Sequence, residues 1–337
     1  MLNFDEERFV RIQTGALAAA EDLDAIVTKC LDGGAENLFF LGAGGVMLLT
    51  EPAQRLLQVR STFPVHYEKG AELVETDSVH LGPTSIVVMP SLSGTTKEAV
   101  AALEFAKAKG ATVITLTGHA DTPIARQADY NVTNFAEDDT SSEMFYLQTL
   151  LVALSVMRHR GELDDYEETV AELRLLPQLL VEVKQAFEPR AQALAEKLKD
   201  ETYHIITGAG STWPEAYYYG MCILEEMQWI RTRPVHASDF FHGTLELVEP
   251  GVSVLVLTGE DQTRPLSQRV EQFAPRFTDK VEVLDTADLS LPGVSASTRA
   301  LISPVLLATV FERLSAHLEV LRDHPLTTRR YYKQLEY

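Results

Sequence analysis

Two short segments in the second half of the chain carry residues that could do acid–base chemistry. Glu225 and Glu226 lie within an otherwise apolar, helix-like run, Met221–Ile230. A carboxylate among apolar side chains holds its proton more readily, which suits a general acid or base. The structural alternative, with one glutamate in solvent and the other in a cap or ion pair, remains open for this pair.

The second segment gathers two histidines and two acids within twelve residues: His236, Asp239, His242 and Glu246. Such side chains could bind a metal. However, the six-residue histidine spacing, with two phenylalanines between, matches no familiar ligand pattern. A single histidine that acts as an acid, a base or a sugar-binding group is the better interpretation. We therefore expect no metal site.

A hydroxyl-rich loop in the first half could bind an anion. The residues Ser-Leu-Ser-Gly-Thr-Thr at 91–96 directly follow a strand-like run and directly precede a helix-like one. Hydroxyls and backbone N–H groups at a helix N-terminus favour a phosphate without any lysine. An ordinary Ser/Thr helix cap is the alternative. The glycine-rich loop 42–45 is a companion, but it does not complete Gly-x-Gly-x-x-Gly, so we expect no dinucleotide cofactor.

An internal repeat indicates how these loops are positioned. Three strand-like runs recur in the same order in both halves: 37–45 with 203–211, 85–91 with 253–259, and 112–117 with 280–285. Short continuous apolar runs are typical of buried parallel strands. Three paired runs in one order favour a true repeat over chance glycine turns.

Helix-like stretches separate the strands, at 97–109 before Gly110, at 141–157 and at 177–198. Pro189 is expected to kink or interrupt the last of them. This alternation predicts an α/β protein with two doubly wound parallel-sheet domains, whose ligands lie beyond the carboxyl ends of the strands.

The composition of the chain argues against some classes of binding partner. The 337-residue chain carries a net charge of −20, which argues against nucleic acid and acidic membranes as partners. Two distant cysteines suggest no disulfide framework, and no uninterrupted apolar run approaches the length of a membrane span. The N-terminus lacks the pattern of a signal peptide, so we expect a cytoplasmic protein.

Four segments together resemble the tandem sugar-isomerase (SIS) domain family, and most closely its fructosamine 6-phosphate deglycase branch. They are the loop 91–96, Glu-Met-Gln-Trp at 226–229, Phe-Phe-His-Gly at 240–243, and the tail 324–337. The resemblance implies two tandem flavodoxin-like SIS domains, each a three-layer αβα fold. It also implies a homodimer or higher homo-oligomer with shared active sites, and a sugar phosphate as the small-molecule partner.

The resemblance also implies roles for individual residues. Glu226 would move a proton between C1 and C2 of the sugar. His242, sixteen residues later, would help open the ring and would come from the neighbouring subunit. The 6-phosphate and sugar hydroxyls would be bound by Gly45, Ser91, Ser93, Thr96 and Ser141. The tail around Arg329, Arg330 and Tyr331 would close over the site, with Arg330 as its substrate-binding residue, and no cofactor would be needed.

Two positions depart from the family pattern. Val46 stands where relatives usually have a phosphate-binding serine, and Thr244 follows His-Gly where proline is usual. These changes could alter substrate choice. We predict a deglycase that converts a fructosamine amino-acid 6-phosphate to glucose 6-phosphate and a free amino acid. The alternatives are an aldose–ketose phosphosugar isomerase, a deglycase of 2-amino-aldose 6-phosphates, and a non-catalytic sugar-phosphate-binding protein.

The domain organisation follows from the repeat and the resemblance. We predict an N-terminal helical segment at 1–35 and a first SIS domain at 36–165. A linking helix at 166–200 leads to a second SIS domain at 201–322, followed by the tail at 323–337.

Overall fold

The computed structural model describes residues 1–138, 142–332 and 334–335. The chain divides into two compact units. The N-terminal unit is Glu6–Pro177, and the C-terminal unit combines Met1–Asp5 with Gln178–Tyr337. Each unit is described by itself. The predicted domain boundaries stay a prediction.

The N-terminal unit is built on a five-stranded parallel sheet of order β2-β1-β3-β4-β5. Its strands are β1 Asn37–Gly42, β2 Val65–Lys69, β3 Ser85–Ser91, β4 Thr112–Thr117 and β5 Tyr130–Thr133. Its helices are α1 Glu6–Ala18, α2 Ala20–Asp32, α3 Gly45–Leu48, α4 Glu51–Arg60, α5 Gly70–Thr76, α6 Lys97–Ala108, α7 Pro123–Gln127, α8 Glu143–His159 and α9 Tyr166–Leu173.

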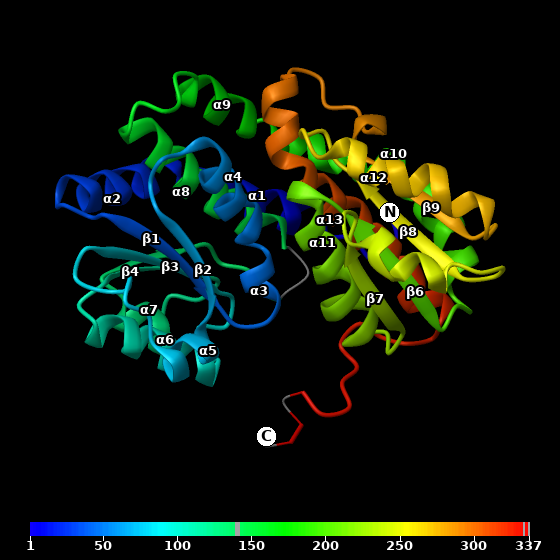
Figure 1. The fold of residues 1–337 in the computed structure, drawn as a ribbon, viewed down its shortest axis with the longest axis horizontal. Coiled ribbons are helices and arrows are strands. Elements are labelled where there is room, and N and C mark those ends of the chain that lie inside the picture. Colours follow the sequence, from blue (N-terminus) through cyan, green and yellow to red (C-terminus); the bar gives the residue numbers. More distant parts are fainter. Residues whose placement is uncertain (139–141, 333, 336–337) are drawn as a thin grey trace. The chain divides into compact units, whose positions relative to one another are not determined.

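Helices cover both faces of this sheet, which explains why its central strands are apolar throughout. Every residue of β3 is buried. Phe39, Val87 and Val113 belong to a core shared with α5, α6 and α7. Figure 1 shows these three helices on one side of the sheet and α1, α2 and α8 on the other. The three-layer arrangement confirms the predicted flavodoxin-like fold for this unit.

The C-terminal unit has a four-stranded parallel sheet of order β7-β6-β8-β9, the same topology with one strand fewer. Its strands are β6 Tyr203–Gly208, β7 Arg231–His236, β8 Ser253–Thr258 and β9 Val281–Asp285. Its α-helices are α11 Trp213–Tyr218, α12 Arg264–Phe273 and α13 Ala296–Leu321, and α10 Leu176–Leu198 begins two residues before the unit. Short helical turns are η1 Gly210–Thr212, η2 Tyr219–Glu225, η3 Phe240–His242, η4 Thr244–Leu247, η5 Ala274–Arg276 and η6 Thr286–Asp288.

Two helices of this unit differ from the expectations. Helix α10 continues through Pro189, so the proline does not interrupt it. Helix α13 is long and apolar enough to cross a membrane by length and composition, whereas the sequence, which has no uninterrupted apolar run of that length, led us to expect no span. Within the described residues, 89% of its apolar window is buried inside the protein, as in a core helix. The predicted α/β class with two doubly wound parallel sheets is confirmed.

Candidate functional site

In the N-terminal unit, the strand order reverses between β1 and β3. These neighbours pair in parallel, with Asn37 opposite Ser85 and Phe40 opposite Val88. The chain leaves β1 toward one side and β3 toward the other, which opens a crevice beyond their carboxyl ends. The Gly42–Gly45 loop follows β1, and the Ser91–Thr96 loop follows β3. The two predicted phosphate loops therefore meet at the place where such folds bind ligands.

The Ser91–Thr96 loop is a compact turn held by its own hydroxyls. The Gly94 N–H donates to the Oγ of the buried Ser91 at 3.2 Å. The N–H and hydroxyl of Thr95 both point to Ser93 Oγ, at 3.4 and 3.2 Å. Gly94 has φ +61, and a side chain there would meet Thr122 Cβ at 2.6 Å. The loop therefore requires glycine at 94 and orders the serines around it.

The loop ends at a helix N-terminus whose amides are open. Thr96 is the N-cap of α6, but its side chain makes no capping hydrogen bond. The first-turn N–H groups of α6 have no intrahelical acceptor, and the helix dipole adds positive charge there. Thr95 and Thr96 are exposed beside them. The loop can therefore offer an anion several donors, and the ordinary capping alternative does not describe Thr96.

The Gly42–Gly45 loop lies at the end of β1. Gly44 has φ +63, with nothing within 4 Å of the place a side chain would occupy, and Gly45 begins α3. A Cβ on Gly42 would lie 2.9 Å from Met47 Cβ, so the strand can approach α3 closely. Val46 is half-buried within α3 and supplies no hydrogen-bond donor from its side chain. Ser141 lies outside the described residues.

In the C-terminal unit, Glu226 directly follows a π-helical turn, Tyr219–Glu225. The Glu226 N–H donates to Met221 O at 3.1 Å, one residue further back than in an α-helix. Trp229 then has φ +56, which is rare for a bulky residue. Glu225 points elsewhere, because its carboxylate accepts from the N–H and hydroxyl of Thr232. The two neighbouring glutamates therefore have different positions, and Glu225 has the structural one.

The chain's tail holds Glu226. Arg329 Nε donates to Glu226 Oε1 at 2.9 Å, and these side chains are 12% and 34% exposed, respectively. The same guanidinium donates to Leu326 O at 2.6 Å and Thr328 O at 3.0 Å. Arg330 lies over the Trp229 ring, 3.8 Å from its centroid. The contact from Arg329 Nε therefore fixes the position of a partly exposed carboxylate.

His242 ends η3 and is exposed. Gly243 follows with φ +147, a conformation that favours glycine. Thr244, at the position where proline is usual, is buried and accepts a hydrogen bond from Arg233 Nε at 3.1 Å. A proline could not accept this bond. The departure therefore has a local structural role.

The clustered His/Asp/Glu segment does not form a metal site in the part of the chain that is described. His236 Nδ1 lies 2.7 Å from Ser238 Oγ, and its ring contacts Trp213 edge to face. Across the described residues, no group of three or more His, Cys, Asp or Glu side chains could hold a metal ion. The metal alternative for this segment therefore has no structural support.

The structure thus brings the predicted residues together in two sets. Gly45, Ser91, Ser93 and Thr96 share the β1–β3 crevice of the N-terminal unit. Glu226 and the tail share the C-terminal unit. The direct partner of Glu226 is Arg329, and the substrate-binding role of Arg330 stays a prediction. The paired arginines at 329 and 330 were the available signal, but their sequence does not say which one reaches the carboxylate.

Comparisons with known proteins agree with this architecture. The SIS domain family model matches residues 34–158. Fructosamine deglycase FrlB of Bacillus subtilis is 29% identical over 311 residues, which is 90% of this chain and 93% of that protein. Fructoselysine 6-phosphate deglycase of Escherichia coli K12 is 28% identical over 308 residues, covering 91% and 88%.

A solved structure extends the match to both units. The Salmonella typhimurium LT2 protein, provisionally described as a phosphosugar isomerase, is 30% identical, with a TM-score of 0.86. The similarity covers 95% of this chain and 97% of that one. The chain therefore belongs to the SIS domain family.

Proposed function

We propose that this protein is a deglycase that converts a fructosamine amino-acid 6-phosphate to glucose 6-phosphate and a free amino acid. Two curated relatives that align with about nine-tenths of the chain are named as deglycases. They and the family support an enzyme of sugar-phosphate metabolism, of the deglycase or isomerase type. The observation that carries the proposal is the partly exposed Glu226 carboxylate, which Arg329 holds at the end of a π-helical turn.

The substrate's phosphate would bind to the hydroxyl-rich loop. In our proposal, Ser91, Ser93 and Thr96 and the open amides of α6 hold the 6-phosphate, with the Gly45 N–H nearby. This arrangement supplies donors without a lysine, so it suits an acidic chain. Ser141 would contact the sugar hydroxyls and Arg330 would help close the site.

The chemistry needs only proton transfers. The open-chain substrate has an amine on C1 and a ketone at C2. Glu226 removes a proton from C1, and the electrons form a C1–C2 enaminol. Return of the proton to C2 leaves an imine at C1, and water hydrolyses it to the aldehyde and the free amine. His242, contributed by the second subunit of a homodimer, would help open the ring beforehand. No redox or metal chemistry is required for these steps.

A matched pair of variants tests the assignment. Glucose 6-phosphate released from fructosyl amino-acid 6-phosphates is measured with a coupled dehydrogenase. Glu226→Gln should lower kcat by about 10²–10⁴-fold, the usual contribution of a general acid–base group, and leave folding and substrate binding intact. Glu225→Gln makes the same change one residue away, where the amide oxygen can still accept from Thr232, and should retain most activity. Normal turnover by the Glu226 variant would remove the assignment.

Sugar-phosphate isomerisation is the second candidate, because the Salmonella structure with 30% identity is provisionally described as a phosphosugar isomerase. An isomerase would interconvert fructose 6-phosphate and glucose 6-phosphate without releasing an amine. Measuring the amine and the sugar in one reaction separates the two activities and also tests 2-amino-aldose 6-phosphates. Substrate binding without any turnover would instead identify a sugar-phosphate-binding protein. A cytoplasmic location is part of the proposal.

A further inference from the structure

The C-terminal unit has its own pair of loops at a strand-order reversal. Its order β7-β6-β8-β9 reverses between β6 and β8, as the N-terminal order does between β1 and β3. The loop after β6 is Gly208–Thr212, and the loop after β8 is Gly259–Thr263. We infer that this second crevice is an anion site whose permanent occupant is the protein's own Asp261 carboxylate.

The repeat places Asp261 at the position of a phosphate-loop serine. Ser253 begins β8 as Ser85 begins β3, 168 residues earlier. The same spacing relates Asp261 to Ser93 and Thr263 to Thr95. A carboxylate thus replaces a hydroxyl in the middle of the corresponding loop.

The hydrogen bonds repeat along with the positions. In the N-terminal unit, Ser93 Oγ accepts from the N–H and hydroxyl of Thr95. In the C-terminal unit, Asp261 Oδ1 accepts from the N–H of Thr263 at 2.8 Å and from its hydroxyl. In both loops the donating threonine therefore lies two residues after the acceptor, which is Ser93 in one loop and Asp261 in the other.

Asp261 differs from Ser93 in bridging the two loops. Its Oδ2 accepts from the Ser211 N–H at 2.9 Å and from the Ser211 hydroxyl at 2.7 Å. Asp261 therefore gathers four donors, two from each loop, as a bound phosphate oxygen pair would. In the described part of the N-terminal unit, by contrast, no hydrogen bond joins Gly42–Gly45 to Ser91–Thr96. One crevice is bridged internally and the other is open.

The backbone of the Gly208–Thr212 loop packs closely against the Asp261 carboxylate. Gly210 has φ +56, and a Cβ there would lie 2.6 Å from Asp261 Oδ2. Burial alone would raise the pKa of Asp261, but the bonds from Thr263 and Ser211 outweigh it and hold the pKa below its usual range. The group is therefore charged at neutral pH and repels other anions.

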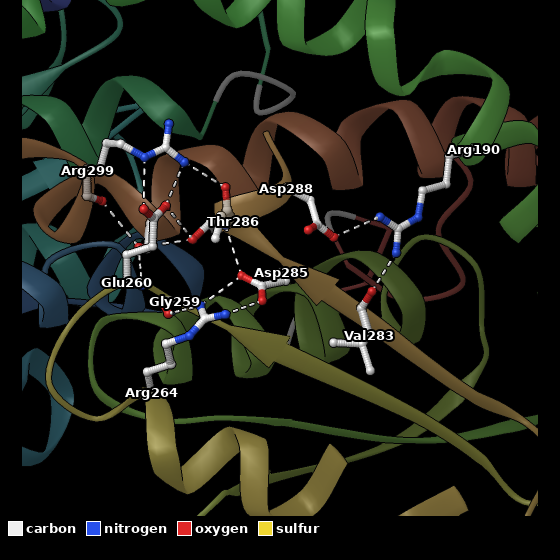
Figure 2. A network of polar contacts seen from close by, with 11 residues as sticks. Arg190, Gly259, Glu260, Arg264, Val283, Asp285, Thr286, Asp288 and Arg299 are labelled. Carbon is white, nitrogen blue, oxygen red and sulfur yellow. Dashed lines mark hydrogen bonds and ion pairs between the residues drawn. The ribbon is translucent and has the colours of Figure 1, made fainter. Parts of the chain in front are cut away.

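The nearby arginines are also engaged by carboxylates, as Figure 2 shows. Arg264, at the start of α12, donates to Gly259 O and to both oxygens of Asp285. Arg299 makes a two-pronged contact with Glu260, at 2.8 Å for each bond, and reaches Thr286 O at 2.9 Å. These cations are neutralised within the unit, so they do not recruit an external anion.

The occupant that Asp261 replaces has the chemistry of inorganic phosphate or a phosphate monoester. Shortening the side chain to serine should remove the charge and vacate the two Ser211 donors, which creates an anion site, while the serine can accept from Thr263 as Ser93 accepts from Thr95. Asp261→Ser restores the residue type of position 93. Asp261→Asn is the matched control, because it removes the charge but still fills the crevice.

The experiment measures thermal unfolding of both variants and the wild-type protein in inorganic phosphate and in chloride of equal ionic strength. We expect Asp261→Ser to unfold at a lower temperature in chloride and to recover several degrees in about 10 mM phosphate, because a ligand that binds only the native state stabilises it. In the wild type and in Asp261→Asn, phosphate should raise the unfolding temperature by a smaller amount, because it binds only to the N-terminal loop that all three proteins share. Calorimetric titration with phosphate should find one additional site per chain in Asp261→Ser.

Equal phosphate effects in the three proteins would overturn the inference. If Asp261→Ser does not fold in chloride, its refolding yield in phosphate against chloride gives the same comparison, and no rescue would count against the inference. Thr278→Val is a further control. It removes the hydrogen bond from Thr278 to Val252 O, away from the crevice, and its loss of stability should not be recovered by phosphate. None of these outcomes depends on deglycase activity, since no sugar is used.

Discussion

Replacing Arg329 with glutamine should release the tail from Glu226. The arginine makes one ion pair and two hydrogen bonds to main-chain carbonyls of the tail, Leu326 O and Thr328 O. Glutamine is too short and lacks the charge to make all three. Other contacts also hold the tail, among them the bonds from Gln228 Nε2 to His324 O at 2.7 Å and from the Leu326 N–H to Glu319 Oε1 at 3.0 Å. The ion pair of Arg329 is the contact that joins the tail to Glu226.

The magnitude follows from the one contact of Arg329 that leaves the tail. The two carbonyl bonds lie within the tail, so they can persist when it is released. The ion pair contributes about 1 kcal/mol, the upper end for a pair with solvent access, because Glu226 is 34% exposed. This energy corresponds to roughly a fivefold shift in the equilibrium between the docked and released tail.

Hydrogen exchange measures this shift directly. The amide of Leu326 donates to Glu319 Oε1 when the tail is docked, so its exchange rate reports release. We expect about fivefold faster exchange in Arg329→Gln, with no change in β6 amides. Arg330→Gln is the control. It removes only an exposed cation–π contact with Trp229, about 0.5 kcal/mol, and should accelerate exchange by about twofold. Equal protection in the two variants would refute the anchoring role.

Two further predictions concern the sheets. Gly94→Ala should destabilise the N-terminal unit by about 1–2 kcal/mol, because φ at this position is +61, and should raise KM for a sugar phosphate more than it lowers kcat. Urea unfolding measures the loss of stability and steady-state kinetics measures KM and kcat, with Gly82→Ala, which has open space around it, as the control. Burial lowers the pKa of His204 from 6.5 to about 4, so its contribution to stability is complete above pH 6.5 and is lost, by about 3 kcal/mol, as pH falls toward 4. In urea unfolding between pH 7 and 4.5, the free energy of unfolding should depend less steeply on pH in His204→Asn than in the wild type. An identical dependence on pH in the two proteins would contradict this prediction.

The central strands and the phosphate loop could be predicted because their signals are local. Strand β3 is buried throughout and therefore apolar throughout, and the Ser91–Thr96 loop directly joins it to α6. The edge strands β2 and β7 were missed for the opposite reason, although the edge strand β9 was predicted. β2 and β7 pair on one side only, and their half-buried sequences mix charged and apolar residues. β7 also contains Pro234, which a central strand would not accommodate.

Contacts between residues far apart in the sequence are the second feature that could not be predicted. Glu226 and Arg329 are 103 residues apart, and no spacing rule connects a helical turn to a tail at that distance. Pro189 shows the same dependence on packing. A proline costs an isolated helix about 3 kcal/mol, but Phe187, Ala191 and Leu194 around it are buried, and their packing keeps α10 helical. Asp261 was visible in the repeat, but its role required the donors around it.

The π-helical turn before Glu226 gives this segment one residue that a regular helix would not contain. A π-turn holds one residue more than an α-turn, so the main chain around Tyr219–Glu225 carries an extra residue. Deleting one residue in a regular α-helix rotates the side chains on one side of the deletion by about 100° relative to those on the other. A deletion within this turn would instead let an ordinary α-turn form, so that Glu226 would keep nearly the same orientation relative to the residues before the turn. The turn can therefore absorb the loss of one residue that a regular helix could not, and Glu226 could still reach Arg329.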